Sequence, residues 1–239
     1  IEKGAVYKMQ NLENQFLLLQ LNDSLFPIGG YSHSYGLETY IQKGLVYDYD
    51  TAREYLHNRL RYNFLYTDLM AGRLSYEAAS SQDLSSLDAL EEILEASRIP
   101  KEIREASKKL GSRFIKTLLH MHAPYLDGFF SSYIKLRQGK TSSHPCAYGV
   151  FCACAGIPLM DTLSAFLYSQ ASASVTNCVK TIPLSQSDGQ RLLRDMYPLF
   201  QEILKETISC SKEMFCVSAP AFDLRCMEHE YLYSRLYMS

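Results

Sequence analysis

The spacing of apolar residues along the chain predicts a protein built from α-helices. Apolar side chains recur at intervals of three and four residues through most of the sequence, which is the spacing of one helix face. Alternation of apolar and polar residues, which is typical of strands, is hard to find over more than about four positions. No repeat at a fixed period emerges. We therefore predict one all-α domain, residues 1–239, folded as a helical bundle of roughly ten helices.

The N-terminal part of the chain is expected to form two helices separated by a turn. Residues 13–25 are apolar on most sides, which is typical of a central, well-buried helix. Pro27 and the glycines after it end this helix, because proline lacks the backbone donor and glycine is flexible. A second helix over residues 33–43 ends at Gly44, where glycine suits the left-handed C-terminal cap.

Clear start signals mark the helices in the middle of the chain. Thr51 and Glu54 form a capping box, and the helix that they open carries an apolar stripe at every fourth residue. Further helices are predicted over residues 84–96, 100–120 and 124–136. The stripe after the capping box consists of Leu56, Leu60 and Phe64, and the stripe of the second of these later helices consists of Ile103, Leu110, Phe114 and Leu118.

A polar segment separates the two halves of the sequence. Residues 137–145 (RQGKTSSHP) carry Gly, Ser and Pro and are predicted to be an exposed loop, where any boundary between halves would lie. Beyond it, a helix is expected over residues 159–180. A second capping box at residues 187–190 opens a helix that would kink at Pro198, and the last helix begins near Pro220.

Composition and charge narrow the classes of function. Hydrophobic residues make up 47% of the 239 residues and charged ones 21%, as in an ordinary globular protein. A net charge of −2 argues against a nucleic-acid partner, because phosphate binding requires a basic surplus. No apolar run approaches the roughly 18 to 20 residues that span a bilayer, and the start lacks the apolar core of a signal peptide. We expect a cytoplasmic protein without a membrane partner.

Cysteine and tyrosine usage add two smaller indications. The seven cysteines lack the close pairs that mark a disulfide framework or a zinc finger, so we expect buried, reduced thiols. Tyr occurs 18 times and Trp is absent. Because Tyr combines apolar area with a polar tip, this usage favours a binding surface.

Candidate chemistry is sparse. Neither GxxxxGK nor GxGxxG is present, so nucleotide binding by this chain is unsupported, and no catalytic set of residues is recognisable. Cys152 and Cys154, like His120 and His122, lie two positions apart, which on a helix separates them by about 200°. The acidic and imidazole groups of residues 228–230 could bind a divalent ion transiently, could offer a hydrogen-bonding patch to a partner, or could form a solvated helix face. We therefore predict neither catalytic residues nor a firm metal site.

Residues 26–38 (FPIGGYSHSYGLE) form the most distinctive segment of the sequence. Its glycines permit positive φ, and Ser32 or Ser34 could cap the next helix, so a tight turn is one interpretation. The longer stretch LNDSLFPIGGYSHSYGLETYI, residues 21–41, resembles the N-terminal signature of the UreF family of urease accessory proteins. Residues 169–193 and 227–239 resemble that family's later helix-loop stretch and its C-terminal tail, so the resemblance covers nearly the whole chain.

The resemblance implies a function that the residues alone do not. UreF-like proteins are all-helical adaptors, usually dimeric and without catalysis of their own. They join the accessory protein UreD, also called UreH, and the GTPase UreG on apo-urease. That assembly couples GTP hydrolysis to nickel insertion. We therefore expect no stably bound cofactor, with nickel handled by the complex and GTP bound by the partner.

The resemblance also suggests two partner-facing surfaces. We hypothesise that residues 27–36 and the tail from Glu228 onward face UreG and UreD, in an order that the sequence does not reveal. Arg235 is a plausible anchor, because its planar fork can bind a carboxylate while stacking on tyrosine. The terminal residues 1–12 and 231–239 are expected to be flexible until a partner binds. The predicted partner-binding residues are Pro27, Gly29, Tyr31, His33, Ser34, Gly36, Glu38, Glu228, His229, Tyr231, Tyr233, Arg235 and Leu236.

Three further interpretations complete the predictions. A homodimer could form through Tyr168, Ala171 and Val175, which combine aromatic and small residues on one helix. The protein could instead be a direct nickel carrier that uses Cys226, His229 and Glu230. It could also be a helical-bundle enzyme or cofactor binder whose pocket uses His33, Glu38 and a cysteine.

Overall fold

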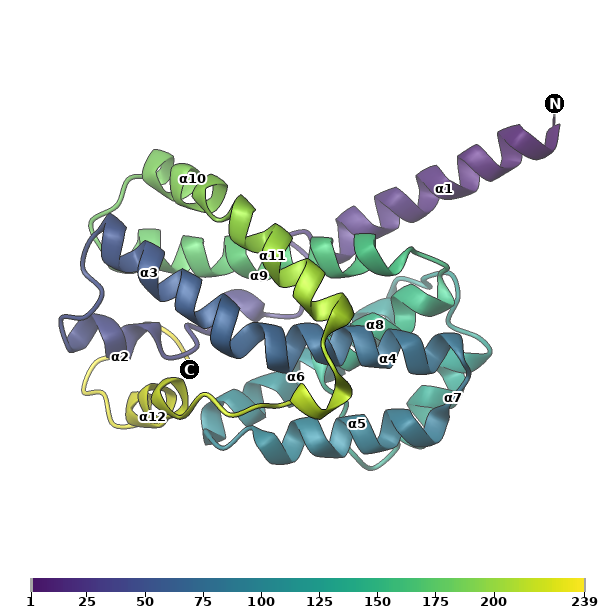
Figure 1. The fold of residues 1–239 in the computed structure, drawn as a ribbon. Coiled ribbons are helices and arrows are strands. Elements are labelled where there is room, and N and C mark those ends of the chain that lie inside the picture. Colours follow the sequence, from purple (N-terminus) through teal and green to yellow (C-terminus); the bar gives the residue numbers. More distant parts are fainter. Residues whose placement is uncertain (1, 239) are drawn as a thin grey trace.

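The computed structural model describes residues 2–238, with the side chains of residues 2–11 and of Tyr31 left out. Within that range the chain forms twelve α-helices, two short 3₁₀ turns and one π-helical segment, and no β-strand occurs there (Figure 1). The prediction of a single all-α helical domain is confirmed.

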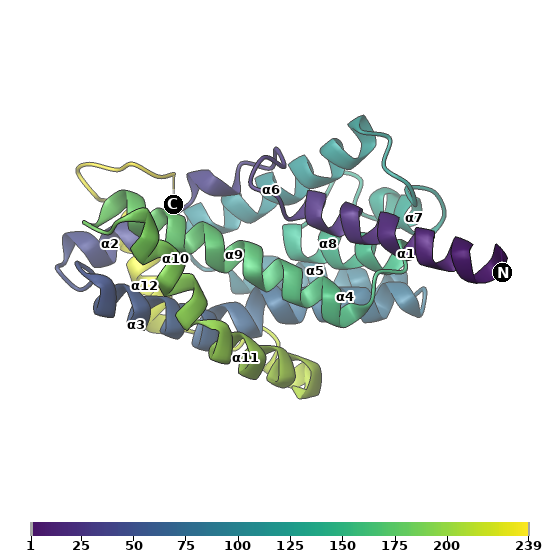
Figure 2. The same ribbon diagram turned by 90° about the horizontal axis from the view of Figure 1, so that it is seen from above.

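The N-terminal helix does not lie at the centre of the bundle. α1 (Glu2–Leu21) projects away from the other helices (Figures 1 and 2). Leu17 and Leu21 are buried, whereas Phe16 is 62% exposed and Leu19 is 67% exposed. The prediction of a central helix over residues 13–25 is therefore wrong, because only one stripe of this apolar segment meets the body of the protein.

The central helix is α8 (His144–Cys154). Every side chain from His144 to Cys152 is buried, and the helix packs against α4, α6, α7 and α9. Its small residues permit this close packing. A Cβ atom on Gly149 would lie less than 3.0 Å from the carbonyl oxygen of Gly72 on α4, a distance that real Cβ atoms essentially never show.

One long helical rod runs beside α8. α3 (Tyr49–Arg59), the π segment η2 (Leu60–Leu69) and α4 (Met70–Ser80) follow one another without a break. Leu60, Leu65 and Leu69 are fully buried, and the five-residue step between the first two matches the wider turn of a π-helix. The predicted apolar stripe at Leu56, Leu60 and Phe64 is confirmed, since all three are buried.

Both capping boxes lie upstream of their predicted positions. The backbone N–H of Thr51 donates to Asp48 Oδ1 over 2.9 Å, and the N–H of Asp48 donates to Thr51 Oγ1 over 3.0 Å. An equivalent pair, Ser185 with Asp188, opens α10 (Gln186–Asp195). The chain then breaks at Met196 before α11 (Tyr197–Ser209), so Pro198 lies in the first turn of a new helix rather than at a kink.

The other helices differ from the prediction mainly at two N-terminal ends. α2 (Leu37–Gln42) starts later than residue 33, because Tyr35 and Gly36 adopt left-handed backbone with φ of 53° and 81°. α7 (Phe129–Leu136) starts after Gly128, whose φ is 70°. The remaining elements are α5 (Leu84–Ser97), α6 (Lys101–His120), α9 (Leu159–Thr181) and α12 (Pro220–His229), close to their predicted bounds, with the 3₁₀ turns η1 (Gly30–Ser32) and η3 (Lys212–Met214).

The segment predicted as an exposed loop, residues 137–145, is largely buried. Arg137 and Ser143 are each less than 9% exposed, and the backbone N–H of Ser143 donates to Glu91 Oε2 over 2.9 Å. A Cβ atom on Gly111 of α6 would clash with the backbone at Ser142, so glycine is needed for the segment to pass. Residues 138–140 do face solvent, whereas Arg137 and residues 142–145 are buried in the fold.

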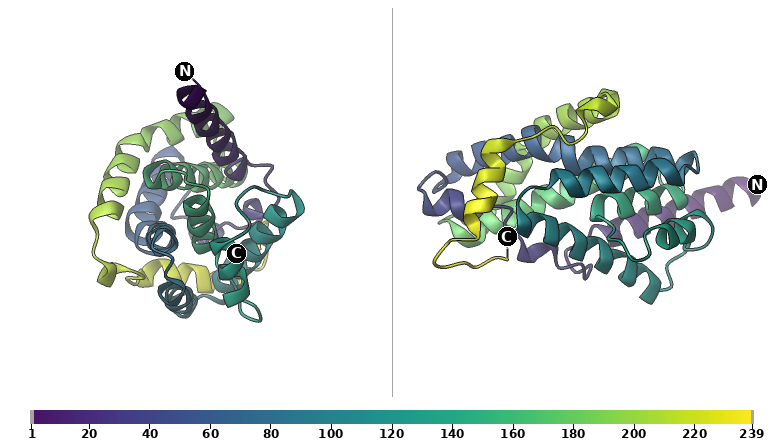
Figure 3. Two further views of the ribbon diagram at one scale, coloured as in Figure 1. Left: turned by 90° about the vertical axis from the view of Figure 1, so that its right-hand side faces the viewer. Right: turned by 90° about the horizontal axis from the view of Figure 1, so that it is seen from below.

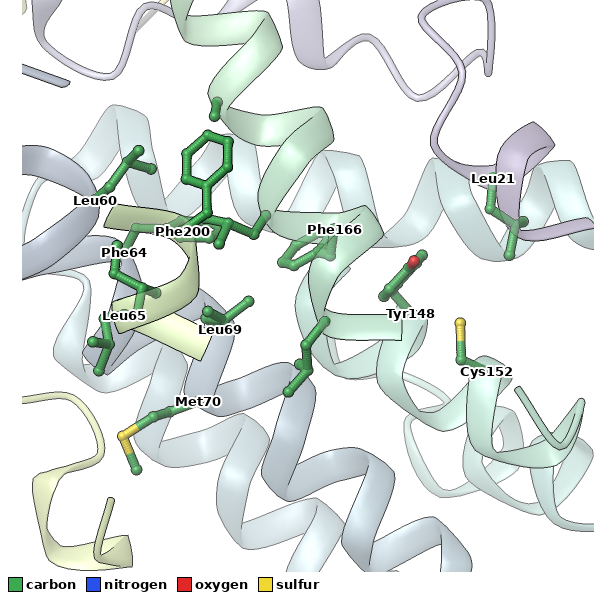
Figure 4. Close-up of a cluster of buried hydrophobic side chains, with 14 of the residues drawn as sticks. Leu21, Leu60, Phe64, Leu65, Leu69, Met70, Tyr148, Cys152, Phe166 and Phe200 are labelled. Atoms are coloured by element: carbon green, nitrogen blue, oxygen red, sulfur yellow. The ribbon is translucent and has the colours of Figure 1, made fainter. Parts of the chain in front are cut away.

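Aromatic rings dominate the core that α8 shares with its neighbours. Tyr148 stacks on Phe166 of α9 with ring centroids 4.9 Å apart, and Leu60, Leu65 and Phe200 fill the adjoining space (Figure 4). Within residues 2–238, no helix is both long enough and apolar enough to cross a membrane.

His144 should make the stability of the protein depend on pH. Its ring lies among Phe114, Tyr148 and Phe166, with the nearest ring centroid 5.2 Å away, and burial lowers its pKa from 6.5 to about 4. As the pH falls, His144 is therefore protonated in the unfolded chain before it is protonated in the folded chain. Its contribution to the free energy of unfolding is fully present above pH 6.5. That contribution is lost as the pH falls toward 4, which lowers the stability by up to about 3 kcal/mol.

Urea unfolding between pH 7 and pH 4 would measure this effect. We expect the free energy of unfolding to fall less steeply with decreasing pH in His144→Leu than in the original chain. His33, whose pKa burial also lowers to about 4, and carboxylates such as Asp88 and Glu206, whose pKa values hydrogen bonds to Lys and Arg hold down, contribute the residual slope in both proteins. Equal slopes would contradict the assignment to His144.

Candidate functional site

The distinctive segment of residues 26–38 folds into a turn that presents a buried carboxylate. Gly29, Tyr35 and Gly36 have positive φ, and the turn delivers the chain into α2 at Leu37. Glu38 lies in the first turn of that helix, where the helix dipole favours a negative charge, and it is only 8% exposed. A buried carboxylate of this kind must find hydrogen-bond donors.

The donors to Glu38 come from the other end of the sequence. Glu38 Oε2 lies 3.0 Å from His229 Nε2 and accepts from the backbone N–H of Tyr237 over 3.0 Å. Glu38 Oε1 accepts from the backbone N–H of Leu236 over 2.7 Å. The C-terminal tail, residues 231–238, is thereby attached to α2 by hydrogen bonds to one side chain.

A second carboxylate, Glu102 in the first turn of α6, completes the arrangement. Glu102 Oε2 lies 2.6 Å from His229 Nδ1, and Glu102 Oε1 accepts from Arg235 Nη1 over 2.6 Å. Both ring nitrogens of His229 therefore lie within hydrogen-bond distance of a carboxylate oxygen. We call Glu38, Glu102, His229 and Arg235 the Glu38 cluster.

Three distant segments of the chain meet at the Glu38 cluster. The backbone N–H of Met238 donates to the Ser32 carbonyl over 2.8 Å. Asn177 Nδ2 of α9 donates to the His33 carbonyl over 2.9 Å. Residues 26–38, 169–193 and 227–239, which carry the family resemblance, therefore form one site, and the C-terminus lies beside α2 and α12 (Figures 1 and 3).

Close packing seats α12 against the turn. A Cβ atom on Gly36 would lie 2.9 Å from Cys226 Sγ and 3.4 Å from the backbone nitrogen of the same residue. Gly36 also has a φ of 81°, so a larger residue would be unfavourable for two independent reasons. Cys226 itself is 1% exposed and forms part of this contact.

The predicted partner-binding residues divide into an outer and an inner group. Tyr231 is 87% exposed, Tyr233 is fully exposed, and Arg235 and Leu236 are also at the surface. Pro27 is exposed, Glu228 is partly exposed, and the side chain of Tyr31 lies outside the described residues. The inner group, buried and able to shape the surface rather than contact a partner, is Gly29, His33, Ser34, Gly36, Glu38 and His229.

The cluster of residues 228–230 is not a solvated helix face. His229 is completely buried between two carboxylates, whereas its neighbour Glu228 forms surface ion pairs with Lys43 at 3.1 Å and Arg225 at 2.7 Å. Both ring nitrogens of His229 are engaged, so the nickel-carrier set of Cys226, His229 and Glu230 is not assembled. Among the described side chains, no group of three or more His, Cys, Asp and Glu could hold a metal ion.

The buried thiols are unsuited to nucleophilic chemistry. Burial raises the pKa of Cys178 to about 12 and raises the pKa of Cys226 as well. Thiols with raised pKa values stay protonated near neutral pH and react slowly. The enzyme alternative, with His33, Glu38 and a cysteine in one pocket, therefore gains no support, because Glu38 is already occupied by the tail.

The residues proposed for a dimer interface do not share one surface. Tyr168 is 46% exposed and could meet a second copy of the chain. Ala171 is 1% exposed and Val175 is 5% exposed, since both pack into the core of this chain. The two residues cannot present the surface expected of them, and only Tyr168 remains as a candidate.

Glu102 and Asn177 belong to the site but were not predicted from the sequence. Glu102 follows Pro100 at the start of a helix, where an acidic residue is common for the helix dipole alone. Asn177 lies inside α9 among apolar residues. The signal available in the sequence is an asparagine inside an apolar helix. A buried side-chain amide of this kind needs a hydrogen-bond acceptor elsewhere in the protein.

Comparison with known proteins gives a consistent result. The family model described as UreF matches residues 46–197. A protein of Actinobacillus pleuropneumoniae named urease accessory protein UreF is 37% identical over 224 residues, covering 93% of this chain and 97% of the relative. Proteins of the same name from Haemophilus influenzae (strain PittEE) and Lachnoclostridium phytofermentans are 35% and 32% identical, each over 93% of this chain, covering 94% and 97% of the relatives.

Proposed function

Because the chain belongs to the UreF family of urease accessory proteins, we propose that it is a non-catalytic adaptor in urease maturation. In this proposal the protein bridges UreD and the GTPase UreG on apo-urease and regulates GTP-dependent nickel insertion. GTP is bound by the GTPase, and nickel is handled by the assembly rather than by a resident site in this chain. The assembly works in the cytoplasm.

The observation that carries the proposal is the surface above the Glu38 cluster. Tyr231, Tyr233 and Leu236 expose large apolar areas on a segment whose backbone is fixed by Glu38. Aromatic residues and arginine are the types enriched among the residues that dominate binding energy at interfaces. Because the tail is held in one place, less conformational entropy is lost when a partner binds.

Arg235 supplies the charged element of this surface. Its Nη1 atom is held by Glu102, yet the side chain remains 39% exposed. A guanidinium has five N–H donors, so several stay available for a carboxylate of a partner. The ion pair with Glu102 orients the guanidinium and leaves its other N–H groups able to bind a partner.

Replacing Arg235 tests the proposal. We expect Arg235→Ala to weaken co-purification with UreD or UreG by more than about 30-fold in affinity and to reduce urease activation accordingly. The ion pair with Glu102 is partly exposed, so its loss should change the stability by less than about 1 kcal/mol. Arg194→Ala, at an exposed arginine on α10, is the matched control.

The outcome that contradicts this role is unchanged binding of both partners and unchanged activation in Arg235→Ala.

We also propose a homodimer, with Tyr168 at or near the contact, since this exposed aromatic residue lies outside the tail surface. Light scattering on the purified chain decides this point, because a single-chain mass at every concentration excludes the dimer.

A further inference from the structure

The charge of the chain is unevenly distributed. Between residues 106 and 160 the sequence contains seven Lys and Arg residues and a single acidic residue, Asp127, although the net charge of the whole chain is −2. Lys109, Arg113 and Lys116 follow one another at intervals of four and three residues on α6, so they share one face of that helix. The acidic residues of α6, Glu102 and Glu105, both precede Lys109, and none follows it along the helix.

A groove lies where the neighbouring face of α6 approaches α7 and the segment after it, and of Lys109, Arg113 and Lys116 only the last lines it. Its volume is about 540 Å³. α7, which supplies Ile134 and Lys135 to the groove, lies toward the end of the bundle remote from the C-terminus (Figure 2). None of the residues that line the groove is acidic. They are Ser112, Ile115, Lys116, Leu119, Ile134, Lys135, Arg137, Gln138, Lys140, Thr141 and Ser142.

The cations of the groove fall into two classes. Arg137 and Lys140 are neutralised by Asp88 and Glu92, at distances between 2.6 and 3.3 Å. Lys116 and Lys135 form no ion pair with any side chain that the structure describes, and both are exposed. Two cations on different helices therefore face the groove without a counter-charge.

Apolar side chains lie between these two lysines. Ile115 and Ile134 are partly buried against the core, and Leu119 remains 46% exposed. The groove therefore combines exposed apolar area with two unpaired positive charges. The combination suits a ligand that carries both negative charge and apolar side chains.

We propose that this groove docks an acidic amphipathic segment of a partner protein. Carboxylates of that segment would pair with Lys116 and Lys135, and its aliphatic side chains would cover Ile115, Leu119 and Ile134. The groove shares α6 with the Glu38 cluster, but none of its lining residues belongs to the cluster or to the tail, so it does not depend on the role proposed for them. Duplex nucleic acid fits less well, because its affinity comes from many phosphate contacts and it would leave the apolar lining uncovered.

The test uses a labelled synthetic helical peptide of about 18 residues, roughly 27 Å long, with Glu on both sides of a Leu stripe. The variant K116E/K135E reverses both free charges. The control K180E/K205E changes the net charge equally at exposed lysines of α9 and α11. At roughly 50 mM salt, where screening is weak, we expect at least about ten-fold weaker peptide binding by the first variant and less than about two-fold by the control.

Two further probes separate the alternatives. A peptide with Gln in place of every Glu, and one with Ala in place of every Leu, should each bind the original chain at least about ten-fold more weakly. The proposal is overturned if the two double variants bind the Glu–Leu peptide equally, or if the original chain does not bind it. It is also overturned if a DNA duplex or phosphatidylserine vesicles bind more tightly than the peptide and lose binding in K116E/K135E.

Discussion

Gly149→Ala is expected to destabilise the fold by about 3 kcal/mol or more, because the new methyl group has no space. Its Cβ atom would lie within 3.0 Å of the carbonyl oxygen of Gly72 and of Ser75 Oγ. The carbonyl belongs to a helix backbone and cannot rotate away. α8 would have to move as a unit, and every side chain from His144 to Cys152 that it buries would move with it.

The facing glycine provides the matched control. A Cβ atom on Gly72 would meet Leu163 Cδ2 at 3.6 Å and the Pro145 carbonyl at 3.8 Å, which are ordinary contacts. Gly72→Ala should therefore be neutral or stabilising by up to about 1 kcal/mol, as for glycine to alanine in a helix. Urea unfolding followed by circular dichroism measures both variants. If they differ by less than about 1 kcal/mol, the tight crossing of α4 and α8 is not what the structure indicates.

Glu38→Ala is expected to release the tail and to abolish partner assembly. The substitution removes the acceptor for Leu236, Tyr237 and His229 at once. It also leaves the buried ring of His229 beside one carboxylate instead of two. Each buried polar group left without a hydrogen-bond partner costs about 1 to 3 kcal/mol, so the attachment of the tail is lost. The tail should then sample many conformations.

Hydrogen exchange of the tail amides measures this release directly. We expect the amides of Leu236 and Tyr237 to lose their protection in Glu38→Ala, while the amides of α8 keep theirs. Glu105→Ala, which removes a 47% exposed carboxylate from the same helix as Glu102, is the control and should leave the tail protected. Unchanged protection in Glu38→Ala would mean that the tail is held by something other than this carboxylate.

The two substitutions on the tail surface separate anchoring from contact. Arg235→Ala should weaken partner binding with the tail still in place, whereas Glu38→Ala should do so by freeing the tail. If Glu38→Ala frees the tail but leaves urease activation intact, the tail is not a docking surface and the proposed role of Arg235 fails with it.

Helix positions could be predicted from the sequence because apolar periodicity is a local property. α5, α6 and α9 each carry a stripe long enough to define both ends. The capping boxes were misplaced because several Ser, Thr, Asp and Glu residues lie within one turn of each other. In both cases Asp takes part in the reciprocal bonds, as the cap at Asp48 and as the third helical residue at Asp188. The π segment had no sequence signal.

The two parts of the candidate site could be found from the sequence, but their association could not. Residues 26–38 and the tail both stand out by composition, and they were assigned to separate surfaces. Contacts between residues about 190 to 200 positions apart leave no periodic trace in a single sequence. The burial of His229 was not predicted for the same reason, because the two carboxylates beside its ring lie on α2 and α6.

Polar composition also led to a wrong prediction of exposure for one segment. Residues 137–145 have the appearance of a surface loop, yet Arg137 is 4% exposed. Its guanidinium is satisfied by Asp88, Glu92 and the Thr141 carbonyl. Composition predicts exposure only where polar groups lack partners within the protein, and here those partners come from α5 and from the segment itself.

The closure of the tail on Glu38 has a consequence for biosynthesis. The amides that Glu38 accepts from are 198 and 199 residues further along the chain. At roughly 5 to 20 residues per second, a ribosome needs about 10 to 40 seconds to make that intervening length. During this interval the carboxylate has to remain hydrated, and the turn that carries it stays incomplete. A nascent chain arrested before His229 would therefore lack the docking surface, so that only fully translated copies could recruit partners.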